Sequence, residues 1–309
     1  MFDIHDLRAG VRMVLGVCAS CVVALGVTTH VAFAQPPAQE AQRSWGLVET
    51  NGTRLYYDEA GTGSPVILIH GGWLNSRQWD EQMTVLSRHY RVIRYDCRGS
   101  GRSPLGDSTY AHDDDLAALF TQLHIERAQI IGLSAGAQVA IDFTLSHQAS
   151  VASLMIGSSP LGGFDTGPEF QDGMRGVIGA GVADDLALLH QRIWAFAPFR
   201  VASGMPDVRN RLDAMILHDN TWAANRPNAP KAKRLPTPPA ARLAEIKVPV
   251  LVVIGTGEMT GLVKEGEFVA QNIPGAEIVR VENAGHFANL EQPKQFDDTA
   301  MEWLGRVRR

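Results

Sequence analysis

Short runs rich in apolar residues alternate with amphipathic segments along most of the chain. The runs have the length of buried strands, and they lie at residues 65–70, 91–96, 128–131, 151–156, 248–254 and 277–281. Between them, apolar residues recur at helical spacing over 79–90, 112–124 and 294–307. Two further runs, 46–50 and 54–58, flank Asn51-Gly52, a dipeptide typical of hairpin turns. The alternation of strands and helices predicts an α/β fold with a doubly wound, mostly parallel sheet.

The alternation is interrupted once. Residues from about 160 to 240 show helical patterns in pieces and carry several aromatic side chains, and strand-like sequence resumes at Val248. A chain of 309 residues with 45% hydrophobic content suits one globular domain with an insertion. We therefore expect an α/β core formed by residues 44–159 and 241–309, and a helical cap formed by residues 160–240.

The N-terminal segment differs in composition from the rest. Basic residues lie near its start, an apolar stretch follows over 11–31, and Ala32-Phe33-Ala34 stands before a polar Gln-Pro-Pro segment. These are the parts of a secretory signal peptide. We expect a signal peptide over 1–34 that is cleaved after Ala34, a flexible spacer over 35–43, and a secreted or periplasmic protein.

Two alternatives for this segment are an uncleaved membrane anchor and a lipid attached at Cys18 or Cys21. Polar residues such as Thr28 and His30 weaken a membrane-spanning helix. Cys18 also occupies the position where a lipidation site at Cys21 would require a leucine. Both observations favour cleavage.

Charge and motif content argue against several kinds of partner. The net charge of -5 gives no electrostatic grip on nucleic acid. The sequence has no His-Glu-x-x-His motif and no paired Cys-x-x-Cys sets, so we expect neither a metal site nor a cofactor.

Three aspartates at 113–115 open a predicted helix, where acidic residues offset the helix dipole. We interpret the basic stretch 226–242 as a solvated linker from cap to core rather than as a binding patch.

The sequence Gly132-Leu133-Ser134-Ala135-Gly136 lies between a predicted strand and a predicted amphipathic helix. In this context Gly-x-Ser-x-Gly is a nucleophile elbow, a strained turn that lifts the serine hydroxyl clear of the sheet. Glycines at both ends let the strand and the helix pass close to each other. The helix N-terminus supplies N–H groups for a developing oxyanion. We predict that Ser134 is the nucleophile.

A serine hydroxyl needs a base to take its proton, and an acid commonly orients that base. His286 follows the last predicted strand, in a loop with small residues before it, which suits a base that reaches over the sheet edge. Glu258 lies in the loop after the preceding strand and is predicted to be the acid. Asp165, which follows the strand ending near Ile156, is the alternative.

Two backbone N–H groups are expected to bind the oxyanion. One belongs to Ala135, directly after the nucleophile, and the other to Gly72, in the loop after the strand that ends at Ile69. Trp73 either donates as well or lines the pocket. His70 is interpreted as a structural brace of this loop.

Aromatic side chains of the predicted cap suggest a mainly apolar substrate pocket. We predict Trp73, Trp194 and Phe199 as pocket residues, and Phe196 and Trp222 belong to the same aromatic group. The cap residues suit the interior of the cap equally well.

Four motifs together resemble the α/β-hydrolase superfamily over essentially all of the chain after the predicted signal peptide. They are His70-Gly71-Gly72-Trp73, Asp96-Cys97-Arg98-Gly99-Ser100-Gly101-Arg102-Ser103, Gly132-Leu133-Ser134-Ala135-Gly136 and Gly285-His286. The order nucleophile, acid, histidine is also that of the superfamily. The resemblance implies that residues 96–103 form a structural turn near the site. Glu258 departs from the pattern, since most members carry aspartate there.

Within the superfamily the chain is similar to capped esterases, enol-lactonases and carbon–carbon bond hydrolases. Serine at position 134 separates it from haloalkane dehalogenases and epoxide hydrolases, which use aspartate there. We therefore expect a serine hydrolase that cleaves a small-molecule carboxylic ester or lactone through a Ser-His-acid triad and an acyl-enzyme. One alternative is a hydrolase that cleaves a carbon–carbon bond in a diketone-like substrate. The other is a non-catalytic binding protein, although such a protein has no reason to keep Ser134, Glu258 and His286 together.

Overall fold

The computed structural model describes residues 43–183, 185–218 and 228–307. The predicted signal peptide, the predicted spacer apart from Arg43, and Trp222 lie outside the described residues. Arg43 begins a strand rather than ending a spacer, because its backbone pairs with Ala60 and its guanidinium with the buried Asp58 carboxylate. Within the described ranges, no helix combines the length and the apolar composition needed to cross a bilayer.

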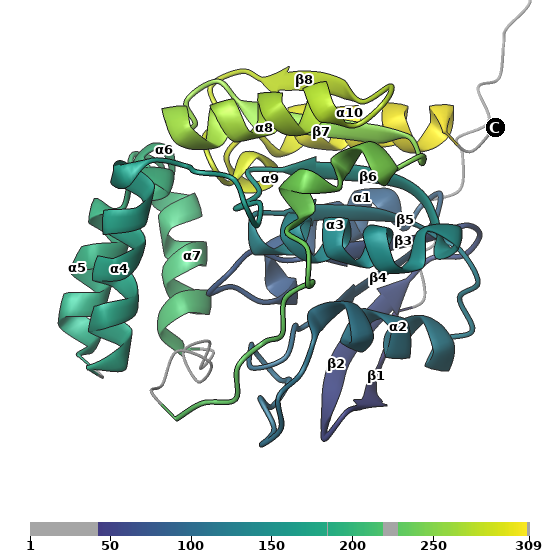
Figure 1. Cartoon of the computed structure of the whole chain (residues 1–309), viewed down its shortest axis with the longest axis horizontal. Helices are drawn as coiled ribbons and strands as arrows, with labels where there is room; N and C mark the ends of the chain where they lie inside the picture. Colours follow the sequence, from purple (N-terminus) through teal and green to yellow (C-terminus); the bar gives the residue numbers. More distant parts are fainter. Residues whose placement is uncertain (1–42, 184, 219–227, 308–309) are drawn as a thin grey trace, which may run out of the picture. The chain divides into compact units, whose positions relative to one another are not determined.

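Eight strands form one sheet in the order β1-β2-β4-β3-β5-β6-β7-β8. Their bounds are β1 Arg43–Thr50, β2 Thr53–Ala60, β3 Pro65–Ile69, β4 Arg91–Tyr95, β5 Ala128–Leu133, β6 Val151–Gly157, β7 Val250–Gly255 and β8 Glu277–Val281. β2 runs antiparallel to both of its neighbours, and every other neighbouring pair is parallel. The predicted hairpin joins β1 to β2, and the predicted mostly parallel sheet is confirmed (Figure 1).

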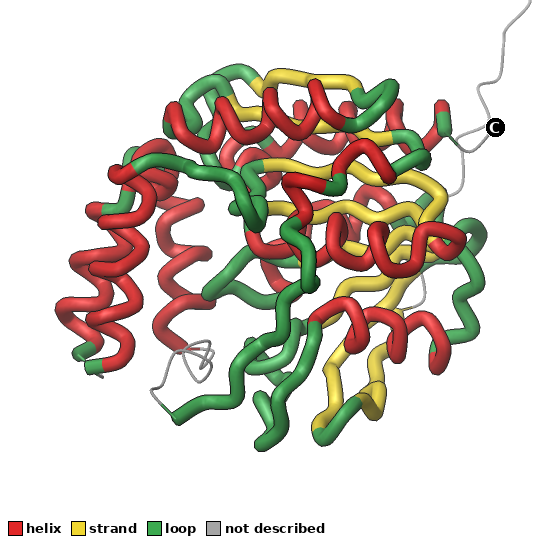
Figure 2. Tube along the Cα trace, in the orientation of Figure 1, coloured by secondary structure: helices red, strands yellow, loops and turns green. Residues whose placement is uncertain are grey.

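Helices cover both faces of this sheet. One face packs against α2 (His112–Gln122), α3 (Ala135–His147) and α8 (Thr260–Asn272). The other face packs against α1 (Asp80–Leu86) and α10 (Pro293–Arg306). Figure 2 shows the strands lying between these two sets of helices.

Among the described residues, four α-helices lie between β6 and β7, inside the segment predicted to be a cap. They are α4 (Pro168–Val182), α5 (Leu186–Ala195), α6 (Arg200–Ser203) and α7 (Pro206–His218), grouped at one side of the sheet (Figure 1). Their buried side chains form a cluster that also contains Leu74, Met259 and Phe287. The inserted helices therefore pack on the loops that follow β3, β7 and β8.

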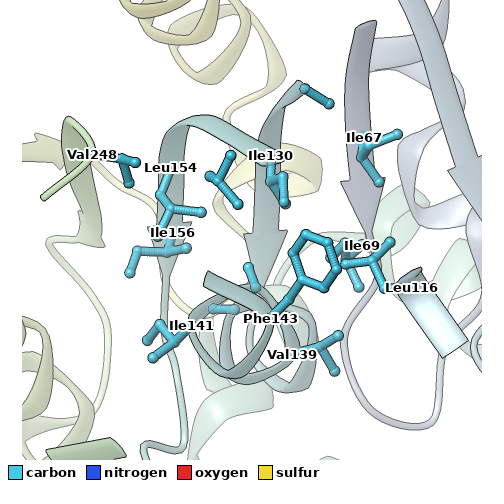
Figure 3. Packing of buried hydrophobic residues seen from close by; sticks show 14 of the residues in the cluster. Ile67, Ile69, Leu116, Ile130, Val139, Ile141, Phe143, Leu154, Ile156 and Val248 are labelled. Carbon is cyan, nitrogen blue, oxygen red and sulfur yellow. The ribbon is translucent and has the colours of Figure 1, made fainter. Parts of the chain in front are cut away.

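The helix after Ser134 is anchored by apolar packing. Ile141 and Phe143 of α3 belong to the buried cluster that includes Ile130 of β5 and Ile69 of β3 (Figure 3). Phe143 is 1% exposed, and truncating such a phenylalanine to alanine costs about 3–5 kcal/mol. This packing fixes the N-terminus of α3 at the carboxyl end of β5.

Candidate active site

Residues 132–136 form a strained strand-to-helix turn. Ser134 has φ 54° and ψ -126°, a conformation that residues with side chains rarely adopt. A Cβ at Gly136 would lie 2.1 Å from the Ile69 carbonyl oxygen, and a Cβ at Gly132 would lie 2.5 Å from the Gly136 carbonyl oxygen. Only glycine permits this close passage of β3, β5 and α3. The predicted elbow geometry is confirmed, with Ser134 half-buried at its tip.

The loop after β3 lies beside the elbow. A Cβ at Gly71 would lie 3.4 Å from the Cβ of Ser134, and a Cβ at Gly72 would lie 3.6 Å from the Cβ of Ala135. Trp73 follows with φ 62°, in the left-handed region. The structure thus brings Gly72 and Ala135, the two residues predicted to donate to an oxyanion, next to each other.

His70 holds this loop from within. Its Nδ1 lies 2.7 Å from the Gly71 carbonyl oxygen, and its Nε2 lies 2.9 Å from the Cys97 backbone nitrogen. Since the Cys97 N–H must donate, Nε2 accepts and Nδ1 carries the proton that goes to Gly71. Burial lowers the pKa of His70, in agreement with this neutral form. The interpretation of His70 as a brace is confirmed.

His286 and Glu258 meet although they come from different loops. The Nδ1 of His286 lies 2.8 Å from Glu258 Oε2, and both side chains are buried. The Met259 N–H donates to the other carboxylate oxygen, Oε1, at 2.8 Å. The carboxylate is therefore fixed at both oxygens, and it fixes one ring nitrogen of His286.

Sequence reasoning missed a third partner of this carboxylate. Ser158, the residue after β6, donates its hydroxyl to Glu258 Oε2 at 2.8 Å, and it has φ 53°. Nothing in the local sequence around Ser158 marks it, because its partner lies 100 residues further along the chain. Only the adjacency of β6 and β7 in the sheet brings the two together.

These residues follow four consecutive strands at one edge of the sheet. Ser134 follows β5, Ser158 follows β6, Glu258 follows β7 and His286 follows β8. Because the four strands are parallel, their carboxyl ends share an edge, where α/β proteins commonly bind ligands. Among the described residues, no hydrogen bond joins His286 to Ser134. Catalytic hydrogen bonds often tighten only when substrate is bound.

Asp165 lies apart from this group. It is exposed, and its Oδ1 accepts from the Gly167 N–H at 2.9 Å and from Gln171 Nε2 at 2.8 Å. The structure therefore brings Glu258, and not Asp165, to His286.

Two further buried glutamates flank Glu258. Glu265 Oε1 accepts from the Leu161 N–H at 2.6 Å, and Glu291 Oε2 accepts from the Gly285 N–H at 2.5 Å. Burial raises the pKa of Glu265 to about 8 and that of Glu291 to about 7, and repulsion from Glu258 acts in the same direction. Both therefore hold backbone groups beside the site without adding a full negative charge to it at neutral pH.

A buried polar network links the loop after β3 to the loop after β8. Gln78 Oε1 accepts from the Gly71 N–H at 2.8 Å, and Gln78 Nε2 donates to Asn289 Oδ1 at 3.2 Å. Asn289 Nδ2 donates to the Gln78 carbonyl oxygen at 3.0 Å and to Gln82 Oε1 at 3.1 Å. Gln82 in turn donates to Asp297 Oδ1 at 2.8 Å. Gly71 lies against Ser134, and Asn289 is three residues from His286, so the network ties two halves of the site together.

A cavity of about 750 Å³ opens beside the elbow and includes Gly72 and Ala135 in its wall. Most of the wall is apolar, with Trp73, Leu161, Phe164, Phe170, Met174 and Ile178 among its residues. Polar side chains also line it: Gln138 and Asp142 of α3, Lys233 and Arg234 of the segment that returns from the inserted helices, and Arg98, Ser100, His112, Thr166, Gln171 and Arg175. The cavity suits a largely apolar small molecule with a polar part.

Of the predicted pocket residues, only Trp73 lines this cavity. Phe199 is buried and packs edge-on against Phe287, with ring centroids 4.8 Å apart, and against Trp194 at 5.6 Å. Trp194 also donates from Nε1 to Asp213 Oδ1 at 2.9 Å. The expectation that Trp194 and Phe199 line the pocket is therefore not supported here. Sequence alone does not separate an aromatic residue on a cavity wall from one inside the inserted helices.

The basic stretch after the inserted helices does more than link them to the core. Its described part pairs Ala232 with Tyr110, and the Lys233 N–H donates to the Tyr110 carbonyl oxygen at 2.6 Å. Residues 232–235 line the cavity, while the side chains of Lys233 and Arg234 are exposed. The segment is a linker whose backbone also forms a cavity wall.

Two of the three aspartates that open α2 have partners within the fold. Asp115 binds the Arg98 guanidinium at 2.6 and 2.9 Å, and Asp113 accepts from Ser146 Oγ at 3.0 Å. In the part of the chain that the structure describes, no group of three or more His, Cys, Asp or Glu side chains has the arrangement to hold a metal ion.

The turn over 96–103 matches its implied structural role. Asp96 accepts from the Ser76 and Arg102 backbone N–H groups, each at 2.8 Å, and a Cβ at Gly101 would lie 2.4 Å from Asp96 Oδ2. Asp96 therefore closes the turn and joins it to the segment after β3.

Several known proteins with similar sequences are hydrolases. The chain is 28% identical to 3-oxoadipate enol-lactonase 1 from Acinetobacter baylyi over 220 residues, which cover 71% of this chain and 80% of the relative. It is 27% identical to 2-hydroxy-6-oxononadienedioate/2-hydroxy-6-oxononatrienedioate hydrolase from Cupriavidus pinatubonensis over 271 residues, which cover 82% and 91%. The solved structure of Est816, an N-acyl homoserine lactone degrading enzyme, has 28% identity and a TM-score of 0.67, covering 83% of this chain and 99% of that one.

The family of this chain follows from a match to a sequence profile. Residues 66–299 match the sequence profile of the alpha/beta hydrolase family, which is most of the described chain. The eight-stranded sheet, the strained serine turn after β5 and the histidine after β8 agree with that match. The chain belongs to the alpha/beta hydrolase family.

Proposed function

We propose that this hydrolase-family protein cleaves a small carboxylic ester or lactone through an acyl-enzyme on Ser134. The observation that carries the proposal is the Glu258–His286 pair, fixed at the same sheet edge as a serine in a strained elbow. An acid that holds Nδ1 keeps the imidazole in the tautomer whose Nε2 is free to take a proton. Support for ester or lactone chemistry also comes from the similarity to an enol-lactonase and to Est816.

The proposed reaction has two halves. Ser134 Oγ attacks the carbonyl carbon while His286 Nε2 takes the hydroxyl proton, and the N–H groups of Ala135 and Gly72 bind the oxyanion. The tetrahedral intermediate then expels the alkoxide, which receives that proton from His286. In the second half, His286 takes a proton from water, the hydroxide attacks the acyl-enzyme, and Ser134 leaves with the proton returned by His286. An ester gives an acid and an alcohol, whereas a lactone gives one hydroxy acid.

The first test is hydrolysis of a chain-length series of p-nitrophenyl esters by the wild type and by Ser134→Ala. We expect turnover that depends on Ser134 and an optimum acyl length set by the cavity. In parallel, a fluorophosphonate probe should label the wild type and not Ser134→Ala. A folded protein that neither hydrolyses any ester nor reacts with the probe would contradict the triad assignment and favour the binding-protein alternative.

A second candidate function is hydrolysis of a carbon–carbon bond. Its support is the similarity to the 2-hydroxy-6-oxononadienedioate hydrolase over 82% of the chain. A protein that reacts with the fluorophosphonate probe, cleaves a dienone substrate and turns over esters only poorly would favour this reaction over ester hydrolysis.

The proposal also covers the N-terminal segment, with residues 1–34 as a signal peptide cleaved after Ala34. The support is the order of basic, apolar and Ala-x-Ala parts in the sequence. The intact mass of the protein recovered from a bacterial periplasm should correspond to a chain that starts at Gln35. A full-length mass would favour an uncleaved anchor, and a mass increased by lipid would favour attachment at a cysteine.

A further inference from the structure

One face of α3 lines the cavity from its catalytic end outward. Ala135, Gln138, Val139 and Asp142 all belong to the cavity wall, and their spacing of three, four and seven residues places them on one side of the helix. At 1.5 Å per residue, Asp142 lies about 10 Å further along the helix than Ala135. A substrate whose carbonyl meets Ala135 and which follows this face of the helix therefore reaches Asp142.

The two polar side chains of this face hold each other in one orientation. Gln138 Oε1 accepts from the Gly162 N–H at 2.7 Å, which assigns the amide oxygen to that side. Gln138 Nε2 then donates to Asp142 Oδ1 at 2.7 Å. Asp142 Oδ2 has no hydrogen-bond partner in the described chain, so this oxygen is left for a group inside the cavity.

The charges around Asp142 argue against an ionic partner. Arg234 and Arg242 lie close enough to lower its pKa, and Asp113 acts in the opposite direction, while burial raises the value to about 7. A substrate carboxylate would meet a carboxylate at Asp142, and a substrate ammonium would meet the two arginines and Lys233. Lys233 and Arg234 are exposed, so solvent weakens their attraction for an anion.

A neutral hydroxyl avoids both the repulsion that a carboxylate meets at Asp142 and the repulsion that an ammonium meets at the nearby cationic side chains. It donates to Asp142 when the carboxyl group is ionised, and it accepts from Asp142 when that group is protonated. Apolar side chains such as Leu161, Phe164 and Met174 form much of the rest of the wall, and a hydroxyl placed against them would lose its hydrogen bonds to water without replacement. We infer that Asp142 and Gln138 form a substrate subsite, and that this subsite binds a hydroxyl group about 10 Å from the bond that is cleaved.

This inference rests on the proposed function, and two series of esters test it. One series is p-nitrophenyl alkanoates of increasing length, each compared with the ester that ends in hydroxyl and the ester that ends in carboxylate. The other series is acetates of alkanols compared with monoacetates of the matching diols, because either side of the ester bond could lie along α3. At the length that reaches Asp142, we expect kcat/KM for the hydroxyl-ended member to exceed that of its methyl-ended partner about tenfold, as one added hydrogen bond to a carboxyl group implies.

Variants test whether the preference for the hydroxyl-ended ester depends on Asp142 or on a general change in the protein. Asp142→Ala should abolish the preference for the hydroxyl, and Asp142→Asn should keep part of it, because the amide still offers a hydrogen bond in the same place. Asp114→Ala is the matched control, since Asp114 is exposed on α2 and does not line the cavity. Equal rates for the hydroxyl- and methyl-ended esters in both series, preference for the carboxylate-ended ester, or a preference that survives Asp142→Ala would each overturn the inference.

A binding measurement separates this inference from the reaction itself. Ser134→Ala should bind a straight-chain diol about tenfold more tightly than the alkanol of the same length in a calorimetric titration, and Ser134→Ala with Asp142→Ala should bind the two equally. If no ester is hydrolysed but the diol is preferred, the proposed reaction fails and the subsite stands. If esters are hydrolysed and the diol is not preferred, the subsite fails and the reaction stands.

Discussion

Ser158 donates a 2.8 Å hydrogen bond to Glu258 Oε2, the same carboxylate oxygen that lies 2.8 Å from His286 Nδ1. One oxygen therefore serves two donors from two loops, while the second oxygen is held by the Met259 N–H. The carboxylate has little freedom to rotate away from the imidazole. Ser158 acts on the proposed catalytic group through Glu258 and is a positioning residue.

Replacement of Ser158 by alanine should lower kcat about tenfold and leave KM nearly unchanged. The variant removes one hydrogen bond to a buried charged group, a loss of about 1.5 kcal/mol if it is felt in the transition state. Ser159→Ala is the control, because Ser159 is buried and its Oγ has no hydrogen-bond partner within the described ranges. Steady-state kinetics on the ester that is hydrolysed fastest give kcat and KM of both variants. Equal rates for the two variants would contradict the positioning role of Ser158.

Glu258→Gln should reduce kcat by roughly 10²–10⁴-fold, and by less than Ser134→Ala does. The amide keeps the size of the side chain but loses the charge that stabilises an imidazolium and selects its tautomer. Asp165→Asn should remain within about twofold of the wild type, because Asp165 is exposed and bonds only to its own turn and to Gln171. An undiminished rate in Glu258→Gln, together with a large loss in Asp165→Asn, would assign the acid to Asp165.

Gln78 and Asn289 should be energetically coupled. Each is buried, and removing either one leaves amide groups of the other without partners. We expect Gln78→Ala and Asn289→Ala each to destabilise the fold by about 3 kcal/mol, with a coupling energy of about 1–2 kcal/mol in a double-mutant cycle. Urea denaturation of the four proteins measures this, and simple additivity would show that the network does not join the two loops.

The contribution of two buried glutamates to stability should fall as pH rises from about 5 to about 8. Burial raises the pKa of Glu265 from an ordinary value of 4.5 to about 8, so in this interval the folded state binds a proton that the unfolded state has released. The favourable contribution is complete below pH 4.5 and is lost as the pH passes the folded value. Glu291, with a pKa of about 7, acts in the same direction.

Glu265→Gln isolates that contribution. Its amide oxygen still accepts from the Leu161 N–H, and it does not ionise. We expect a shallower dependence of the unfolding free energy on pH between 5 and 8, and a variant more stable than the wild type at pH 9 by a few kcal/mol. Chemical denaturation at several pH values tests this, and parallel curves for the two proteins would refute it.

Two glycine-to-alanine variants should have opposite effects. At Gly136 a methyl group would lie 2.1 Å from the Ile69 carbonyl oxygen, so we expect loss of soluble protein or of activity. At Gly179, which is exposed within α4, a methyl group meets nothing within 4 Å, and alanine should stabilise the helix by about 0.5–1 kcal/mol. Expression yield and thermal unfolding compare the two, and a well-folded, active Gly136→Ala would disprove the close passage at the elbow.

Local sequence patterns are sufficient to predict the secondary-structure elements and the elbow. Apolar runs and helical spacing are local, since they depend on residues a few positions apart, and the predicted strands and hairpin agree with the sheet. The elbow is also a local pattern. Gly132 and Gly136 flank Ser134 between a strand and a helix, and this spacing already indicates the geometry that the turn requires. His286 is predicted as the base for the same reason, from its position after the last strand.

Contacts between side chains that are distant in sequence depend on the tertiary structure. Whether Glu258 or Asp165 reaches His286 depends on the loops after two strands that are far from each other in sequence. The Ser158–Glu258 bond spans 100 residues and the Gln78–Asn289 bonds span 211. The same holds for Phe199, which is packed among the inserted helices, and for Asp142, which lines the cavity. Hydrophobic periodicity fixes which side of an element is buried, but hydrogen bonds between loops depend on strand order and on the close packing of the insertion, which no local pattern encodes.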